Sequence, residues 1–228
     1  MISKRILTFV ALAAGIVALT GCSDRADSTS TQDRPEARPC RIGIMTGTVA
    51  QNHGDFRAGE QVERNFAGRV LHVTYPDNYT IERETVVAQL AGLAADPEVR
   101  VILVGQAVPG SSTAARRIRD ARPDVLIGFV GPHEDPDVVS RACDIAIRSD
   151  PDAAGADGEF GWPPVDSVAI LAISRLLVDS VEDKADFRDS TTVQKYLEAE
   201  AGGPVRLRRH DPGGNQWLVT LDSPRPIP

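Results

Sequence analysis

Strand-like and helix-like segments alternate from residue 41 to residue 148, and this alternation constrains the fold more than any other feature of the sequence. Short apolar runs typical of strands occupy residues 41–45, 69–74, 99–105, 125–130 and 144–148. Segments with apolar residues at helical spacing lie between them, at residues 54–67, 80–95, 110–121 and 135–142. Successive βαβ units place parallel strands side by side with helices on both faces. The sequence therefore predicts an α/β, Rossmann-like domain with a mostly parallel five-stranded sheet in flavodoxin-like order.

The alternation stops at Asp150, and residues 151–159 have the Ala, Gly, Asp and Pro composition of a linker. Two helices and a hairpin are predicted beyond it, at residues 165–181, 191–201, 205–209 and 217–221. We expect residues 160–228 to form a tail that packs on the domain of residues 40–150, with its first helix against the flank of the sheet. Three aromatic residues are large enough to form a lid: Phe160, Trp162 and Trp217.

The N-terminus resembles a bacterial lipoprotein signal. Lys4 and Arg5 form a basic segment, and residues 6–19 are almost entirely apolar or small, a run too short to span a bilayer comfortably. The run ends in Leu-Thr-Gly-Cys at Cys22, which resembles the lipobox. The resemblance implies that residues 1–21 are a cleaved signal peptide and that the Cys22 thiol is lipidated. The alternative is an ordinary cleaved signal, or an uncleaved anchor, with a chance cysteine.

Residues 22–39 contain almost no large apolar side chain, and this predicts a disordered tether between lipid and domain. Ser23, not Asp, follows the cysteine, so in a Gram-negative cell we expect the periplasmic side of the outer membrane. The net charge of −7 argues against nucleic acid as a partner. An oxidising envelope would permit a disulfide between Cys40 and Cys143, but nothing in their spacing requires one, and two separate buried thiols are the favoured interpretation.

Four sequence blocks lie at the ends of the predicted strands. They are Ile-Gly-Ile-Met-Thr-Gly-Thr (residues 42–48), His-Val-Thr-Tyr-Pro-Asp-Asn (72–78), Gln-Ala-Val-Pro-Gly (106–110) and Pro-His-Glu-Asp-Pro (132–136). Together they resemble an uncharacterised bacterial lipoprotein family with the type I periplasmic-binding-protein fold. The resemblance implies two lobes with a ligand between them. The segment from the first lobe to the tail is too short for the βαβ units of a second lobe, so we expect one lobe and the tail.

The same blocks carry the candidate site, because the carboxyl ends of parallel strands meet at one edge, where open α/β proteins bind ligands. The predicted ligand-binding residues are Thr46, Gly47, Thr48, Tyr75, Asp77, Asn78, Gln106, His133 and Glu134. Taken singly, residues 46–48 and 75–78 are also ordinary turn compositions. Asp135 has the position of a helix cap, as do Ser111 and Ser112.

No catalytic residue, metal site or cofactor is predicted. Residues 133–135 are three titratable groups in a row, but adjacent residues rarely point at one ion without ligands from elsewhere. The sequence predicts a noncatalytic, solute-binding-like envelope protein that is attached to the membrane by its lipid and binds a small polar ligand weakly. The alternative is a protein–protein interaction module, derived from a degenerate binding protein, whose partner is another envelope protein. An enzyme of unknown class is the third hypothesis.

Overall fold

A computed structural model of the chain describes residues 40–152, 164–210 and 214–221, all within one compact unit spanning Arg38–Pro228. The predicted signal peptide with Cys22, the tether, most of the linker, Phe160 and Trp162 lie outside the described residues. Within the described part of the chain, no helix combines the length and apolar character needed to cross a membrane.

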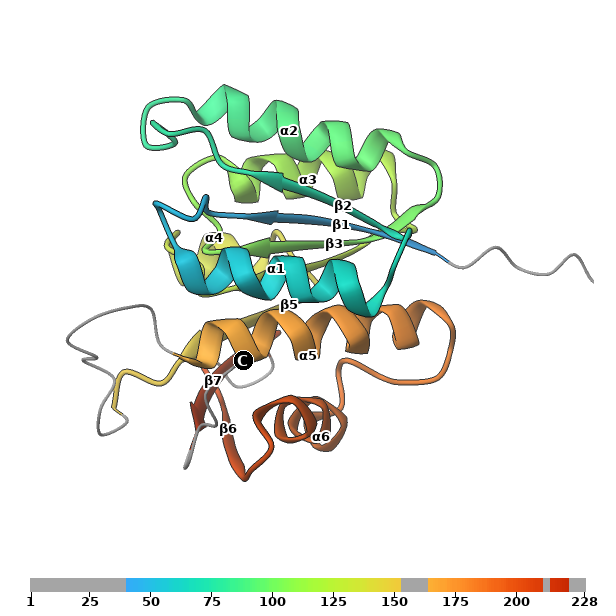
Figure 1. The fold of residues 1–228 in the computed structure, drawn as a ribbon, viewed down its shortest axis with the longest axis vertical. Coiled ribbons are helices and arrows are strands. Elements are labelled where there is room, and N and C mark those ends of the chain that lie inside the picture. Colours follow the sequence, from blue (N-terminus) through green and yellow to red (C-terminus); the bar gives the residue numbers. More distant parts are fainter. Residues whose placement is uncertain (1–39, 153–163, 211–213, 222–228) are drawn as a thin grey trace, which may run out of the picture. The chain divides into compact units, whose positions relative to one another are not determined.

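A single seven-stranded sheet runs through this unit in the order β2-β1-β3-β4-β5-β7-β6 (Figure 1). Its strands are β1 (Arg41–Thr46), β2 (Val70–Thr74), β3 (Val99–Gly105), β4 (Leu126–Val130), β5 (Ile145–Ser149), β6 (Val205–Arg209) and β7 (Gln216–Leu221). Neighbouring strands are parallel, except that β6 runs antiparallel to β7. The α/β fold class and the flavodoxin-like order of the first five strands are confirmed.

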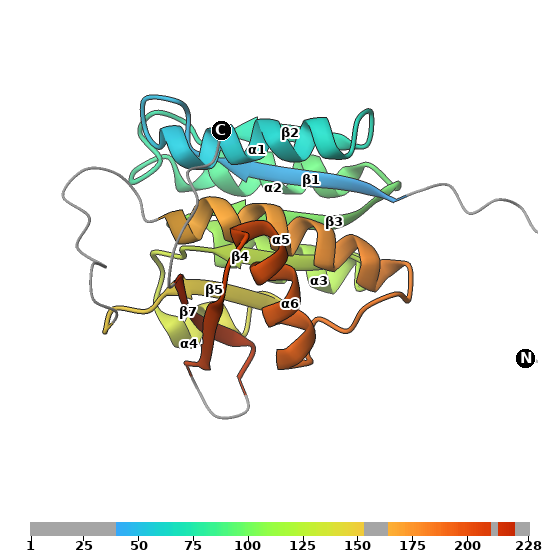
Figure 2. The same cartoon turned by 60° about the horizontal axis from the view of Figure 1, so that its bottom comes forward.

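Helices cover both faces of the sheet. On one face lie α1 (His53–Asn65) and α5 (Pro164–Val181), and α6 (Ser190–Ala201) packs against α5 and β6 (Figure 2). On the other face lie α2 (Arg83–Ala95), α3 (Ser111–Ala121) and the short α4 (Pro136–Ser140). One hydrophobic cluster fills each interface, so the apolar strands β3 and β4 are buried on both sides.

Helix α5 supplies much of the apolar surface on its face, as its sequence predicts. Ile170, Ile173 and Leu177 are buried against the sheet. Gly128 of β4 allows the close approach, because a Cβ built there would lie 3.0 Å from Leu177 Cδ1 and 3.2 Å from Ile173 Cγ2. The expectation that this helix covers the flank of the sheet is confirmed, and its position brings the first turn of α5 beside the end of β4.

The C-terminal hairpin differs from expectation, because it extends the sheet instead of packing on the lobe as a separate tail. Strand β7 pairs in parallel with β5, which would otherwise be an unpaired edge strand. Trp217 lies within β7, buried under the Arg209 guanidinium, so it belongs to the core and not to a lid. Local turn chemistry predicts a hairpin but not its partner strand. Cys40 and Cys143 are both buried and free.

Candidate functional site

The carboxyl ends of the parallel strands β1 to β5 and β7 meet at one edge of the sheet, here called the carboxyl edge. The loops that follow β1, β2, β3 and β4 lie at this edge, together with the first turns of α1, α3 and α5 (Figure 1). The predicted ligand-binding residues therefore all lie at the carboxyl edge, although they differ in what their side chains contact.

The carboxyl edge contains most of the unsatisfied polar atoms of the described residues. Eleven buried side-chain atoms have no hydrogen-bond partner, and three of these belong to Arg41, Gln89 and Asn215. The other eight belong to Asn52, Asp55 (both oxygens), Gln106, Ser111, Ser112, Ser149 and Asp166. A buried polar group without a partner costs about 1–3 kcal/mol, so such atoms are normally rare. Their concentration at one edge marks a surface with unused hydrogen-bonding capacity.

Asp55 lies in the first turn of α1 and is fully buried. Asn52 is the N-cap residue of this helix, and its Oδ1 accepts a hydrogen bond from the Asp55 backbone N–H at 3.1 Å. That bond fixes the orientation of the Asn52 amide and leaves its NH₂ group without a partner. The Asp55 carboxylate lies over the end of β3, where a Cβ built on Gly105 would be 3.2 Å from Asp55 Oδ2.

Asp166 occupies the equivalent position at the start of α5 and is 3% exposed. Its carboxylate lies over Gly131, directly after β4, where a Cβ would be 2.6 Å from Asp166 Oδ2. Gly131 also has a positive φ of 55°, which glycine adopts without strain. Since Gly105 is in register with Val130 on the adjacent strand, the two carboxylates lie over neighbouring strand ends.

Burial and proximity change the titration of this acid pair. Burial raises the pKa of Asp55 to about 8, with a further contribution from the Asp166 charge, while the Asn52 side chain lowers it. Burial raises the pKa of Asp166 to about 7. Both acids therefore titrate near neutral pH, as titratable groups at functional sites often do.

A cavity of about 390 Å³ lies beside Asp166 and is also lined by residues of β5 and β7 and of the loop that follows β4. Arg148, His133 and His210 are among these lining residues. Arg148 is fixed by hydrogen bonds to Gln216 Oε1 and to the carbonyl oxygens of Pro132 and Glu134, at 2.8–3.1 Å. This volume is within the range of small-molecule sites. No group of three or more His, Cys, Asp or Glu side chains among the described residues could hold a metal.

The model of a family described as "Protein of unknown function (DUF3798)" matches residues 40–157, which is more than half of the chain. The chain belongs to the DUF3798 family. Two uncharacterised proteins of Treponema pallidum (strain Nichols) are also similar. One is 32% identical over 117 residues, 48% of this chain and 52% of the relative, and the other is 38% identical over 61 residues, 27% of this chain and 28% of the relative. The chain thus spans about half or less of the length of these relatives.

One solved structure, that of a proposed transcriptional regulator from Clostridium difficile 630, is similar with a TM-score of 0.43 and 16% sequence identity. The match covers 72% of this chain and 48% of that chain. Within the part that matches DUF3798 lie Asn52, Asp55 and Gln106, whereas Asp166 lies beyond it. The acid pair therefore joins a residue of the family region to one from the C-terminal segment.

Among the predicted ligand-binding residues, Gln106 has the environment that most resembles that of a binding group. It follows β3 directly, is buried, and has a positive φ of 62°, which is uncommon for a residue with a side chain. Its backbone N–H donates to the Val130 carbonyl oxygen at 2.6 Å, while its side-chain nitrogen has no partner. Strained backbone beside an unsatisfied side chain is frequent at functional sites.

Other predicted residues are used internally. Tyr75 is buried, and its hydroxyl donates to the Gly105 carbonyl oxygen. Burial chiefly raises the pKa of Tyr75, with contributions from Asp55, Glu134 and Tyr79. Thr46 Oγ1 donates to the Gly47 carbonyl and lies 2.8 Å from His72 Nε2. These contacts give both side chains a structural role beneath the site.

A second group of the residues singled out in the sequence lies at the starts of α3 and α4, where helix caps were expected. Glu134 accepts from the backbone N–H groups of Gly110 and Ser112, so it caps α3 from a neighbouring loop. The expectation that Ser111 and Ser112 are caps is wrong, because both hydroxyls are buried without partners and Gly110 occupies the N-cap position. Asp135 caps α4 as expected, by accepting from Asp137 N and Val138 N.

The remaining predicted residues lie on the loops themselves. Asp77, Asn78 and His133 are exposed, and burial followed by the Arg148 charge lowers the pKa of His133. Gly47 and Thr48 belong to a turn closed by Gln51, which also donates to the Pro76 carbonyl oxygen at 3.0 Å. This bond joins the loops that follow β1 and β2.

Three residues of the site are not among the predicted ones: Asn52, Asp55 and Asp166. They lie at helix starts, whereas the sequence argument considered only the loops directly after strands. Asn52 and Asp55 have the spacing of an N-cap residue and its N3 partner, so the sequence indicates only a helix cap there. Asp166 is brought to the site by the packing of α5, which local sequence does not specify.

Proposed function

We propose that this protein is a noncatalytic, solute-binding-like protein of the cell envelope that binds a small polar molecule at the carboxyl edge. The observation that carries the proposal is the set of eight buried polar atoms at that edge that have no partner in the part of the chain that the structure describes. A bound polar molecule would supply the missing hydrogen bonds, and the cavity beside Asp166 has a suitable volume.

A binding role is favoured over catalysis by the state of the available nucleophiles. The Ser111 and Ser112 hydroxyls have no hydrogen-bond partner among the described residues, so no base activates them. The Cys143 thiol is buried, and burial raises its pKa well above the usual range, which suppresses the reactive thiolate.

The envelope location rests on the sequence of residues 1–22 and on the resemblance to lipid-anchored periplasmic-binding-protein-like proteins. Substitution Cys22→Ser should abolish lipidation. Metabolic labelling with a fatty acid, followed by detergent partitioning, checks this. A Cys22→Ser protein that is still labelled and still partitions into detergent like wild type would refute the anchor.

Binding is tested by thermal unfolding and calorimetry with a panel of small polar metabolites that includes anionic, neutral and cationic members. A single lobe leaves one side of the ligand open to water, so we expect a Kd of roughly 0.1 mM or weaker, about −5.5 kcal/mol. A ligand at 100 times its Kd would add about 2.7 kcal/mol of stability.

The matched variants for this test are Gln106→Gly and Arg122→Ala. Glycine accepts the positive φ at position 106, so Gln106→Gly removes the side-chain amide without straining the backbone. It should reduce the ligand-induced shift. Arg122 lies at the opposite edge of the sheet, so Arg122→Ala should lower stability but preserve the shift. Absence of any stabilising compound across the whole panel would refute the proposed function.

A protein partner at the same edge is the second candidate, favoured by one observation. Val49 and Ile81 are 51% and 81% exposed, they are the exposed large apolar residues of the described part, and both lie on loops of the carboxyl edge. Crosslinking of the intact lipoprotein in cells tests this candidate. An Ile81→Ser variant that gives the same crosslinked species as wild type would contradict it.

A further inference from the structure

The unsatisfied atoms at the carboxyl edge have a specific charge pattern. Three of the eight are carboxylate oxygens, two from Asp55 and one from Asp166. Both acids are at least nine-tenths buried, and no basic side chain among the described residues forms an ion pair with either one. A buried charge without a partner is costly, and a nearby like charge increases the cost.

The backbone below the two acids is shaped to hold them. Gly105 and Gly131 lie at the ends of adjacent strands, and a Cβ at either position would be 3.2 Å and 2.6 Å from Asp55 Oδ2 and Asp166 Oδ2 respectively. Each carboxylate thus lies close to a glycine: a side chain at position 131 would displace Asp166, and one at position 105 would crowd Asp55. The acids also come from two different helices, α1 and α5, so their proximity does not result from one local motif.

We propose that the ligand carries a protonated amine, which is bound between the carboxylates of Asp55 and Asp166. This inference rests on the proposed function and specifies the chemistry of the same site. An ammonium group supplies both the compensating charge and the N–H donors that the unsatisfied carboxylate oxygens accept.

The other unsatisfied atoms distinguish an organic amine from a metal ion. Asn52 and Gln106 each leave a side-chain nitrogen unpaired, and the Asn52 orientation is fixed by its bond to the Asp55 N–H. Amide N–H groups donate to an acceptor and do not coordinate a cation, so a bare metal ion would leave both of these nitrogens without a partner. The ligand should therefore have an acceptor such as a hydroxyl or carbonyl oxygen close to its amine.

The cavity beside Asp166 sets the size of the molecule and its second polar end. A volume of about 390 Å³ suits a small metabolite. Arg148, His133 and His210 line the same cavity and favour acceptor or negatively charged groups on the part of the ligand that lies away from Asp166.

The test uses the full chain and two sets of small probes. Protonated amines (ethanolamine and putrescine) are compared with uncharged matches (ethylene glycol and 1,4-butanediol) by calorimetry and thermal unfolding. We expect at least one amine to bind at least tenfold more tightly than its match. Asp55→Asn and Asp166→Asn should each weaken that binding at least tenfold, whereas Asp120→Asn, an exposed acid on α3, should not change it.

The pH dependence gives an independent readout. Both carboxylates must be ionised to bind an ammonium group, so affinity for the amine should rise at least tenfold from pH 6 to pH 8, the range that contains the raised pKa of each acid. The other titratable groups that face the acids or line the cavity are Tyr75, Glu134, His133, Arg148 and His210. The same titration in Asp166→Asn should be shallower, which separates the acid pair from these groups.

The outcomes distinguish this inference from the proposed function. If uncharged or anionic compounds bind and amines bind no more tightly, the inference that the ligand carries an amine is refuted, while the proposed function stands. Stabilisation by calcium or magnesium chloride that depends on both acids would show that the cation is a metal, and would also refute the amine. If no compound of any charge binds, the proposed function fails as well.

Discussion

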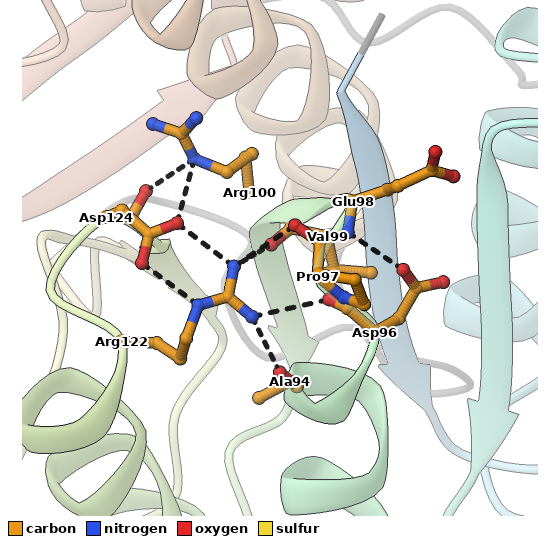
Figure 3. Close-up of polar contacts among 8 residues, drawn as sticks. All are labelled: Ala94, Asp96, Pro97, Glu98, Val99, Arg100, Arg122 and Asp124. Atoms are coloured by element: carbon orange, nitrogen blue, oxygen red, sulfur yellow. Dashed lines mark hydrogen bonds and ion pairs between the residues drawn. The ribbon is translucent and has the colours of Figure 1, made fainter. Parts of the chain in front are cut away.

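The two edges of the sheet use similar polar residues but satisfy them to very different degrees. At the amino edge, where β3 and β4 begin, Arg122 donates to both oxygens of Asp124 and to the carbonyl oxygens of Ala94, Asp96, Pro97 and Val99 (Figure 3). Asp124 also pairs with Arg100 at 3.1 Å. At the carboxyl edge, Asp55 and Asp166 have no basic partner among the described residues, and eight buried atoms there lack hydrogen bonds within this part of the chain.

This difference indicates that the amino edge stabilises the fold, whereas the carboxyl edge retains binding capacity. The Arg122 guanidinium joins the connection between α3 and β4 to the connection between α2 and β3, because it donates to carbonyl oxygens of the latter. Unpaired buried carboxylates do the reverse, because they lower stability until a partner arrives. Proteins often accept lower stability at functional sites, where removal of the unfavourable group stabilises the fold and impairs function.

The largest effect is expected from the amino edge. Arg122→Ala should lower the free energy of unfolding by roughly 2–4 kcal/mol, because several partly buried carbonyl oxygens and Asp124 lose their donor. Arg122→Lys should recover only part of this loss, since an ammonium group cannot reproduce the planar fork. Urea unfolding measures both variants, and a loss below about 0.5 kcal/mol for Arg122→Ala would place this network among ordinary surface contacts.

The opposite sign is expected at the carboxyl edge. Asp166→Asn should raise the free energy of unfolding at pH 8 by roughly 1–3 kcal/mol, because it removes a buried charge and its repulsion of Asp55. Asp120→Asn is the matched control, and as a surface change it should stay within about 0.5 kcal/mol of wild type. A destabilised Asp166→Asn protein would mean that this carboxylate has a structural partner.

The smallest effect concerns the glycine beneath Asp166. Gly131→Ala should cost about 1–2 kcal/mol from its left-handed backbone conformation and should also displace the Asp166 carboxylate. Gly92→Ala, at an exposed position of α2 where a Cβ meets no atom within 4 Å, should instead stabilise by up to about 1 kcal/mol. Thermal unfolding with and without an amine probe compares them, and equal stability of the two variants would contradict the glycine argument.

The sequence predicts the first five strands and their helices because the period of the apolar residues changes clearly between 2 and 3.6. It also predicts which loops form the carboxyl edge, and Gln106 within it. It does not predict that β7 joins β5, because strand pairing is a long-range choice. It equally misses Asp55 and Asp166, which the packing of α1 and α5 brings over Gly105 and Gly131. Tyr75 was expected on an open loop, but its ring is buried and its hydroxyl is bonded to Gly105.

The central claim, that the carboxyl edge contains buried acids without partners among the described residues, is tested most directly by the pH dependence of unfolding in urea. The pKa of Asp55 is raised from 3.8 to about 8 and that of Asp166 from 3.8 to about 7, so the folded protein retains protons that the unfolded chain has already lost. The contribution of these two protonated groups to the free energy of unfolding is therefore fully present below about pH 4, and it is lost as the pH rises to about 8. In Asp55→Asn, we expect a smaller decline over this range, and the variant should become more stable than wild type as the pH increases. Parallel profiles for wild type and Asp55→Asn from pH 4 to pH 8 would contradict the account.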